Sequence, residues 1–132
     1  MKTKLIFPAL FFFLLVFSAS AQTALQDSIQ VISIEKFEKM SAKKKARIVD
    51  VRTPEEVSEG HLEGALNINF LGETFAEEID KLDKKKTYLL YCRSGSRTRK
   101  AADLMQNAGF KHVYMLEGGI TAWKEAGKPI EK

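Results

Sequence analysis

The sequence predicts an α/β protein with a mainly parallel central sheet flanked by helices. Short apolar segments alternate with helical patterns along residues 29–132, without an internal repeat or a domain linker. Residues 87–91 are apolar almost throughout, as in a central strand that is covered on both faces. Strands that alternate with helices at such short spacing are typical of a layered α/β domain.

Five short segments are expected to form the strands of this sheet. They span residues 29–32, 47–51, 65–68, 87–91 and 112–116. In sheets of this type, ligands bind beyond the carboxyl ends of the strands. Asp50 and Cys92 both lie at such ends, so we expect the two side chains to face one crevice.

The first helices are indicated by the residues that begin them. Ser33 suits the N-cap of a helix that carries apolar residues on one face. Thr53, Pro54 and two glutamates then follow the order of N-cap, first-turn proline and acidic first turn, which is the order that starts a helix. A third helix is expected at residues 75–82, where apolar residues again share one face.

Two further helices are expected in the C-terminal half of the chain. The first spans residues 98–107 and is followed by Gly109, a stop signal. Four of its residues are expected to face inward: Ala101, Ala102, Leu104 and Met105. The second begins after the glycine pair 118–119 and carries Ile120 and Trp123.

The first 21 residues form a signal peptide in our interpretation. Two lysines precede a thirteen-residue apolar stretch, and Ala19 and Ala21 fit a signal-peptidase site. A membrane anchor is the alternative, but a bilayer span needs about 20 apolar residues, and Pro8 interrupts this run. The absence of a nearby cysteine argues against a lipoprotein. We therefore expect export to the periplasm or the medium, with residues 22–28 as a short leader to the domain.

Charge and composition argue against several classes of function. Removal of the signal peptide leaves 19 basic residues against 17 acidic ones, so the net charge of +4 becomes +2. The lysine triplets at 43–45 and 84–86 lie between predicted elements without interleaved aromatic residues, so no nucleic-acid binding is expected. One cysteine and two histidines are too few for a Cys/His metal site. No cofactor is expected.

The loop after residues 87–91 carries the most information about function. It begins at Cys92, the only cysteine of the chain. A buried and inert thiol is the alternative for a single cysteine, but Cys92 ends an apolar run and opens a polar loop, where a thiol is expected to be accessible. The glycine at position 95 lets successive N–H groups converge, and the following helix adds its positive dipole.

This arrangement favours a thiolate at Cys92 and an oxyanion bound beside it. Neither His61 nor His112 is close in sequence, and both are expected to be structural. We therefore expect Cys92 to be the catalytic nucleophile. The expected substrate-binding residues are those of the loop: Arg93, Ser94, Gly95, Ser96 and Arg97.

Three segments of the chain resemble the single-domain rhodanese family. They are residues 50–56 with 60–65, residues 91–97 and residues 117–123, and the resemblance extends over about residues 29–126. It implies a rhodanese-like fold and a persulfide on Cys92, formed from thiosulfate with loss of sulfite and discharged to cyanide or a thiol. It also implies that Asp50 and Arg52 brace the crevice without reacting.

Two other functions use a similar scaffold. A cysteine phosphatase or arsenate reductase loop needs five residues between cysteine and arginine, and the required position is occupied by Thr98. A catalytically silent rhodanese-like binding module is the non-enzymatic alternative, and the intact cysteine loop argues against it. A sulfur carrier that reacts with a thiol of a partner protein remains open.

Overall fold

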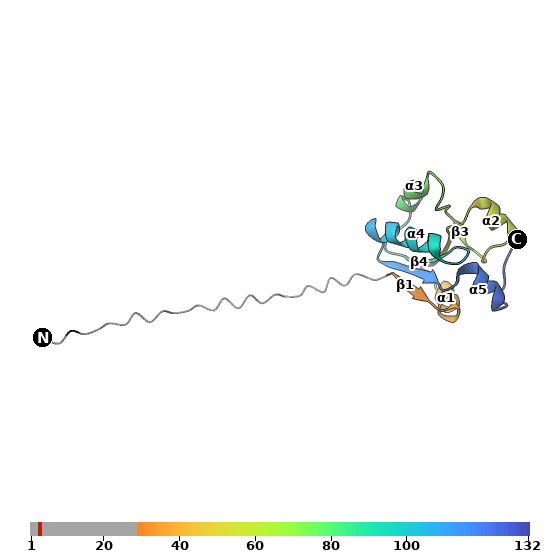
Figure 1. Cartoon of the computed structure of the whole chain (residues 1–132), viewed down its shortest axis with the longest axis horizontal. Coiled ribbons are helices and arrows are strands. Elements are labelled where there is room, and N and C mark those ends of the chain that lie inside the picture. The colour runs from red at the N-terminus through yellow and green to blue at the C-terminus, as the bar shows by residue number, and fades with distance from the viewer. Residues whose placement is uncertain (1–2, 4–28) are drawn as a thin grey trace.

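Figure 1 shows the computed structural model of the chain, which describes Thr3 and residues 29–132. Apart from Thr3, the expected signal peptide and the leader at 22–28 lie outside the described residues. Among the helices of the described part, none is long and apolar enough to cross a membrane.

A five-stranded sheet forms the centre of the domain. Its strand order is β1-β5-β4-β2-β3, and all four pairings are parallel, which confirms the predicted fold class. Strands β2 and β4 are neighbours, and Asp50 pairs in register with Tyr91, the residue before Cys92. The strands are β1 (Gln30–Ile32), β2 (Ala46–Asp50), β3 (Leu66–Asn67), β4 (Thr87–Tyr91) and β5 (His112–Leu116).

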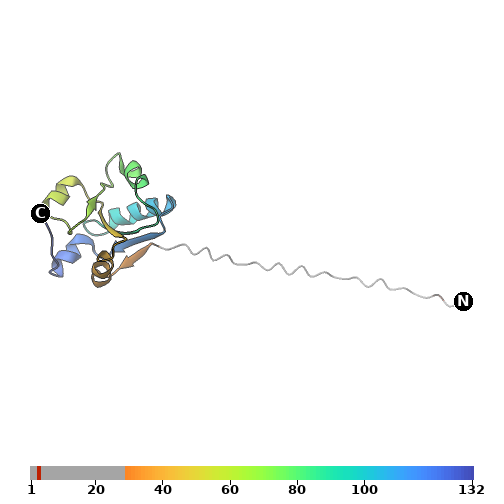
Figure 2. The same ribbon diagram turned by 180° about the vertical axis from the view of Figure 1, so that it is seen from behind.

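Helices cover both faces of this sheet (Figures 1 and 2). Residues of α3 and α4 pack in one apolar cluster, whereas residues of α1 and α5 pack in a second cluster on the opposite face. Strand β4 contributes alternate residues to the two clusters, as expected for a strand that is covered on both faces. The helices are α1 (Ile34–Ser41), α2 (Pro54–Glu59), α3 (Phe75–Asp80), α4 (Ser96–Asn107) and α5 (Gly119–Glu125).

The predicted N-caps are present in the structure. Ser33 accepts a hydrogen bond from the Lys36 N–H at 3.2 Å. Thr53 and Glu56 form a reciprocal capping box at the start of α2, with Pro54 in the first turn. These contacts lie within three residues of each cap, so the local sequence specifies them.

Helix α4 differs from the prediction at its start and on its inner face. It begins at Ser96, two residues early, because Gly95 adopts a positive φ of 129° that turns the chain from the loop directly into the helix. Leu104 is 47% exposed, so its predicted inward position is wrong. The inner face instead begins at Thr98 and continues through Ala101, Ala102 and Met105. This spacing follows the helical period of 3.6 residues.

Candidate active site

Cys92 lies directly after the central strand β4, at the start of the loop that leads into α4. The Gly95 N–H donates a hydrogen bond to Cys92 Sγ at 3.1 Å, so the loop curls back over the sulfur. Cys92 is only 1% exposed, which differs from the expected accessible thiol. The reason is that its side chain packs in the same apolar cluster as the alanines of α4. The sulfur therefore lies beneath the loop.

The glycine pair at the start of α5, the N-cap Gly118 and the first helical residue Gly119, holds the loop in place. Two N–H groups of α5 donate to loop carbonyls, from Ile120 to Cys92 at 2.9 Å and from Thr121 to Arg93 at 3.2 Å. Gly119 has a φ of +61°, and a Cβ at this position would lie 2.4 Å from the Arg93 carbonyl oxygen. Only glycine allows this close approach of the two backbones.

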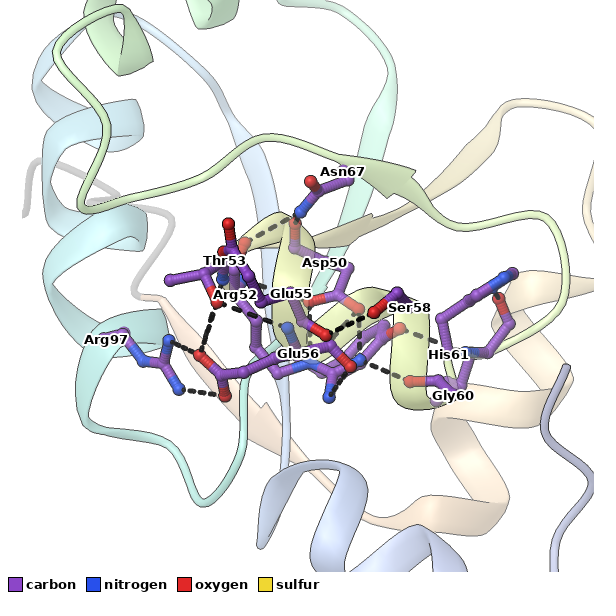
Figure 3. Close-up of polar contacts among 12 residues, drawn as sticks. Asp50, Arg52, Thr53, Glu55, Glu56, Ser58, Gly60, His61, Asn67 and Arg97 are labelled. Atoms are coloured by element: carbon purple, nitrogen blue, oxygen red, sulfur yellow. Dashed lines mark hydrogen bonds and ion pairs between the residues drawn. The ribbon is translucent and has the colours of Figure 1, made fainter. Parts of the chain in front are cut away.

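Arg97 is held by a carboxylate of helix α2 (Figure 3). Its Nη1 and Nη2 atoms contact Glu56 Oε1 and Oε2 at 2.6 and 2.9 Å, a two-pronged ion pair. The hydrogen bonds from Arg97 lower the pKa of Glu56 to about 2 and, with its charge, outweigh the opposing effect of burial. The same carboxylate closes the capping box with Thr53, so one side chain connects α2 to the residues that follow the Cys92 loop.

Arg93 is the loop arginine that remains free. Its side chain is exposed, and no hydrogen bond or ion pair within the described residues holds it. It borders a pocket of about 500 Å³ beside the loop. The other lining residues are Arg52, Glu56, Glu59, Ile120, Thr121, Lys124 and Glu125. A ligand in this pocket would meet the guanidinium of Arg93, while that of Arg97 is already paired with a carboxylate.

Asp50 and Arg52 form an ion pair (Figure 3) whose two side chains are buried, and Arg52 also lines the pocket beside the loop. Arg52 Nη2 lies 2.7 Å from Asp50 Oδ2 and also donates to the Gly60 carbonyl at 2.7 Å. Burial lowers the pKa of Arg52, but the hydrogen bond and charge of Asp50 outweigh it and raise that pKa. Asn67 donates to both backbone carbonyls of the pair, so its geometry is fixed from the β3 side as well. This arrangement fits a bracing role.

The remaining candidates lie as follows. Ser94 on the loop and Ser96 at the start of α4 are exposed, and their contact with a substrate stays a prediction, as it does for the other predicted substrate-binding residues. His61 makes a ring contact to the Leu62 carbonyl at 3.0 Å and pairs through its backbone with Glu131. His112 is exposed at the start of β5. Residues 29–132 contain no group of three His, Cys, Asp or Glu side chains that could hold a metal ion.

Glu56 and Gly119 are site residues that sequence reasoning missed. From the sequence alone, Glu56 indicates only the start of a helix, and Gly119 indicates only the approach to the last helix. Each nevertheless lies in one of the three segments that carry the family resemblance. Those segments were therefore the available signal that both residues belong to the site.

The chain is a parallel α/β domain with a cysteine loop at the end of its central strand. Known proteins with this arrangement identify its family. Residues 33–126 match the Rhodanese-like domain family. The match covers most of the chain and spans the cysteine loop, the Asp50–Arg52 pair and the glycine pair at the start of α5. The chain therefore belongs to the rhodanese-like family.

Individual relatives agree with this assignment. The chain is 33% identical over 99 residues to the thiosulfate sulfurtransferase GlpE of Shewanella oneidensis, which covers 75% of this chain and 96% of the relative. It is 39% identical over 92 residues to the putative sulfurtransferase YtwF of Bacillus subtilis, covering 70% and 86%. The crystal structure of a rhodanese-related protein from Thermoplasma volcanium superposes with a TM-score of 0.68 at 27% identity, covering 77% of this chain and 97% of the other.

Proposed function

We propose that the protein is a sulfurtransferase that moves a sulfane sulfur from thiosulfate, or a similar donor, to cyanide or a thiol through a persulfide on Cys92. The observation that carries this proposal is the curled loop, whose Gly95 N–H points at Cys92 Sγ from 3.1 Å. The loop presents a hydrogen-bond donor to the sulfur at the amino end of α4, which favours an anion there. Relatives named as sulfurtransferases support the same reaction class.

The reaction needs one nucleophile, and the transfer of the sulfur requires no external oxidant or reductant. The Cys92 thiolate attacks the outer sulfur of thiosulfate and forms an S–S bond. The S–S bond of thiosulfate breaks, and its electron pair leaves with sulfite. Cyanide or a thiolate then attacks the outer sulfur of the persulfide, which forms thiocyanate or a new persulfide and restores the Cys92 thiolate. Sulfite is a good leaving group, so no dedicated general acid is required.

Mass spectrometry of the intact protein tests this proposal. After incubation with thiosulfate, the protein is expected to gain one sulfur atom on Cys92 and to lose it on addition of cyanide. The variant Cys92→Ser should gain none. Hydrolysis of an aryl phosphate without any persulfide would instead support the phosphatase alternative. If the protein shows neither activity, the catalytically silent binding module is supported.

The two loop arginines should differ when replaced by alanine. Arg93→Ala is expected to raise the KM for thiosulfate by roughly tenfold or more, because a charge-assisted contact contributes about 1.5–3 kcal/mol. It should leave the free energy of unfolding unchanged, since the side chain has no partner to lose. Arg97→Ala should lower that free energy, because Glu56 loses both of its guanidinium contacts. Steady-state kinetics and urea unfolding measure the two effects. If both variants change the KM and the free energy of unfolding alike, the distinction between a free Arg93 and a paired Arg97 is wrong.

The Glu56–Arg97 ion pair gives a prediction for acid stability. The pKa of Glu56 falls from 4.5 to about 2 on folding, so its stabilising contribution is full above pH 4.5 and is lost as the pH falls through about 2. Glu56→Gln should therefore be less stable than the wild type near neutral pH and should lose less stability on acidification. Urea unfolding at about pH 7 and about pH 3 measures the difference. Glu55→Gln, a change at the exposed neighbouring residue, is the control and should follow the wild type.

Export is proposed from the N-terminal segment. The mature protein is expected to begin at Gln22 and to be recovered from the periplasm or the medium. N-terminal sequencing of the protein expressed from the full coding sequence tests this, and an intact Met1 in the cell interior would contradict it.

A further inference from the structure

Thr98 carries a buried hydroxyl that the resting fold does not use. The residue is 1% exposed, and within the described part of the chain its Oγ1 has no hydrogen-bond partner. An unpaired buried hydroxyl destabilises a protein, and such groups in native structures usually have a reason. Threonine in a helix commonly bonds to a carbonyl of the preceding turn. Oγ1 of Thr98 does not do so, and is therefore available to another acceptor.

The position of Thr98 in α4 places this hydroxyl on the same side of the helix as the Cys92 sulfur. Thr98 lies in the first turn of α4, directly after the loop that curls over Cys92. It shares the inner helix face with Ala101 and Ala102, which are three and four residues further along the helix. These two alanines pack in the same apolar cluster as Cys92. The hydroxyl and the sulfur thus lie at the same end of α4 and on its buried side.

We propose that Thr98 is a positioning residue whose hydroxyl donates a hydrogen bond to the anionic sulfur of the Cys92 persulfide. This inference rests on the proposed function. The resting sulfur already accepts one bond from the Gly95 N–H. Transfer of a sulfur from thiosulfate adds an outer, negatively charged atom in a buried place, and a buried anion needs additional donors. The unpaired hydroxyl of the resting state then becomes the paired hydroxyl of the loaded state.

The equilibrium constant for loading Cys92 with sulfur measures this contact. In the loading reaction, the Cys92 thiolate and thiosulfate give the persulfide and sulfite. Mass spectrometry at fixed thiosulfate and sulfite concentrations gives the loaded fraction, and the equilibrium constant follows from it. Thr98→Val removes the hydroxyl at similar volume and is expected to lower this constant by roughly tenfold or more, as loss of a hydrogen bond to a charged group would. Thr98→Ser retains the hydroxyl and should load nearly as well as the wild type.

Stability of the sulfur-free protein provides the second readout. Thr98→Val should be as stable as the wild type, or more stable, before loading, because it removes an unpaired polar group. The melting temperature of the wild type should then rise on loading by more than that of the variant. Equal loading of wild type and Thr98→Val, or a sulfur-free Thr98→Val that is less stable than Thr98→Ser, would overturn the role of Thr98 alone. A wild type that never forms a persulfide would overturn the proposed function itself.

Discussion

Replacing Gly119 with alanine is expected to destabilise the protein and to impair sulfur loading of Cys92 at the same time. The added Cβ would lie 2.4 Å from the Arg93 carbonyl oxygen and 2.7 Å from that of Cys92. Both neighbours are backbone atoms of the Cys92 loop, so the clash cannot be relieved by rotation of a side chain. The loop must move away from α5, and the hydrogen bonds that the Ile120 and Thr121 N–H groups donate to the loop carbonyls must lengthen.

The size of this effect follows from two contributions. A non-glycine residue at positive φ costs about 1–2 kcal/mol, and overpacking adds about 1–3 kcal/mol. We therefore expect Gly119→Ala to lose about 2–5 kcal/mol of unfolding free energy. Urea unfolding measures that loss, and the persulfide yield at a fixed thiosulfate concentration measures the displacement of the loop.

Gly127→Ala is the matched control for this substitution. Gly127 has a similar φ of +72°, but a Cβ there would meet no atom within 4 Å. It should therefore show only the backbone contribution of about 1–2 kcal/mol, with normal sulfur loading. If the two variants behave alike, the approach of Gly119 to the loop has no role in holding Cys92.

Much of the fold could be predicted because its signals are local. Ser33 and Thr53 cap helices through contacts with residues three positions away. Strand β4 has the predicted bounds, between a lysine triplet and the polar loop that opens at Cys92. Leu104 is exposed because the helical period that places Thr98, Ala101 and Met105 on the inner face turns residue 104 away from it. The start of α4 at Ser96 depends on the backbone of Gly95, which the sequence permits but does not impose.

The site was only partly predictable because its supports come from distant parts of the chain. Arg97 and Glu56 are 41 residues apart, and no local pattern indicates that the guanidinium meets this carboxylate before it meets a substrate. The approach of Gly119 to the Arg93 carbonyl likewise exists only once β4 and α5 are packed together. The sequence predicts one chemistry for the cysteine, glycine and arginines of the loop, and that chemistry stays a prediction. Which arginine is free required the structure.

Asp50→Asn is expected to produce the largest loss of stability among the substitutions considered. Asp50 is fully buried and Arg52 is 4% exposed, and their side chains lie 2.7 Å apart. Asparagine has nearly the same shape, but it leaves the guanidinium charge of Arg52 buried without its counter-ion. Loss of one partner from a buried ion pair costs about 3–5 kcal/mol. This is a large share of the ~5–15 kcal/mol that stabilises a typical domain.

An exposed ion pair in the same protein provides the control. Arg99 and Asp103 lie 4.0 Å apart on α4, with side chains 61% and 55% exposed. Asp103→Asn should therefore change the free energy of unfolding by no more than ~0.5 kcal/mol. Urea unfolding of both variants at neutral pH and moderate salt compares the two pairs directly, and equal losses would contradict a bracing role for Asp50.

The double variant Asp50→Asn with Arg52→Met distinguishes the cost of an unpaired charge from the loss of the contact itself. If the unpaired guanidinium causes most of the destabilisation, removing it should recover part of the free energy lost by Asp50→Asn. Recovery should be incomplete, because the Gly60 carbonyl also loses the 2.7 Å hydrogen bond from Arg52. A double variant less stable than Asp50→Asn would show instead that Arg52 stabilises the crevice mainly through Gly60, independently of its carboxylate partner.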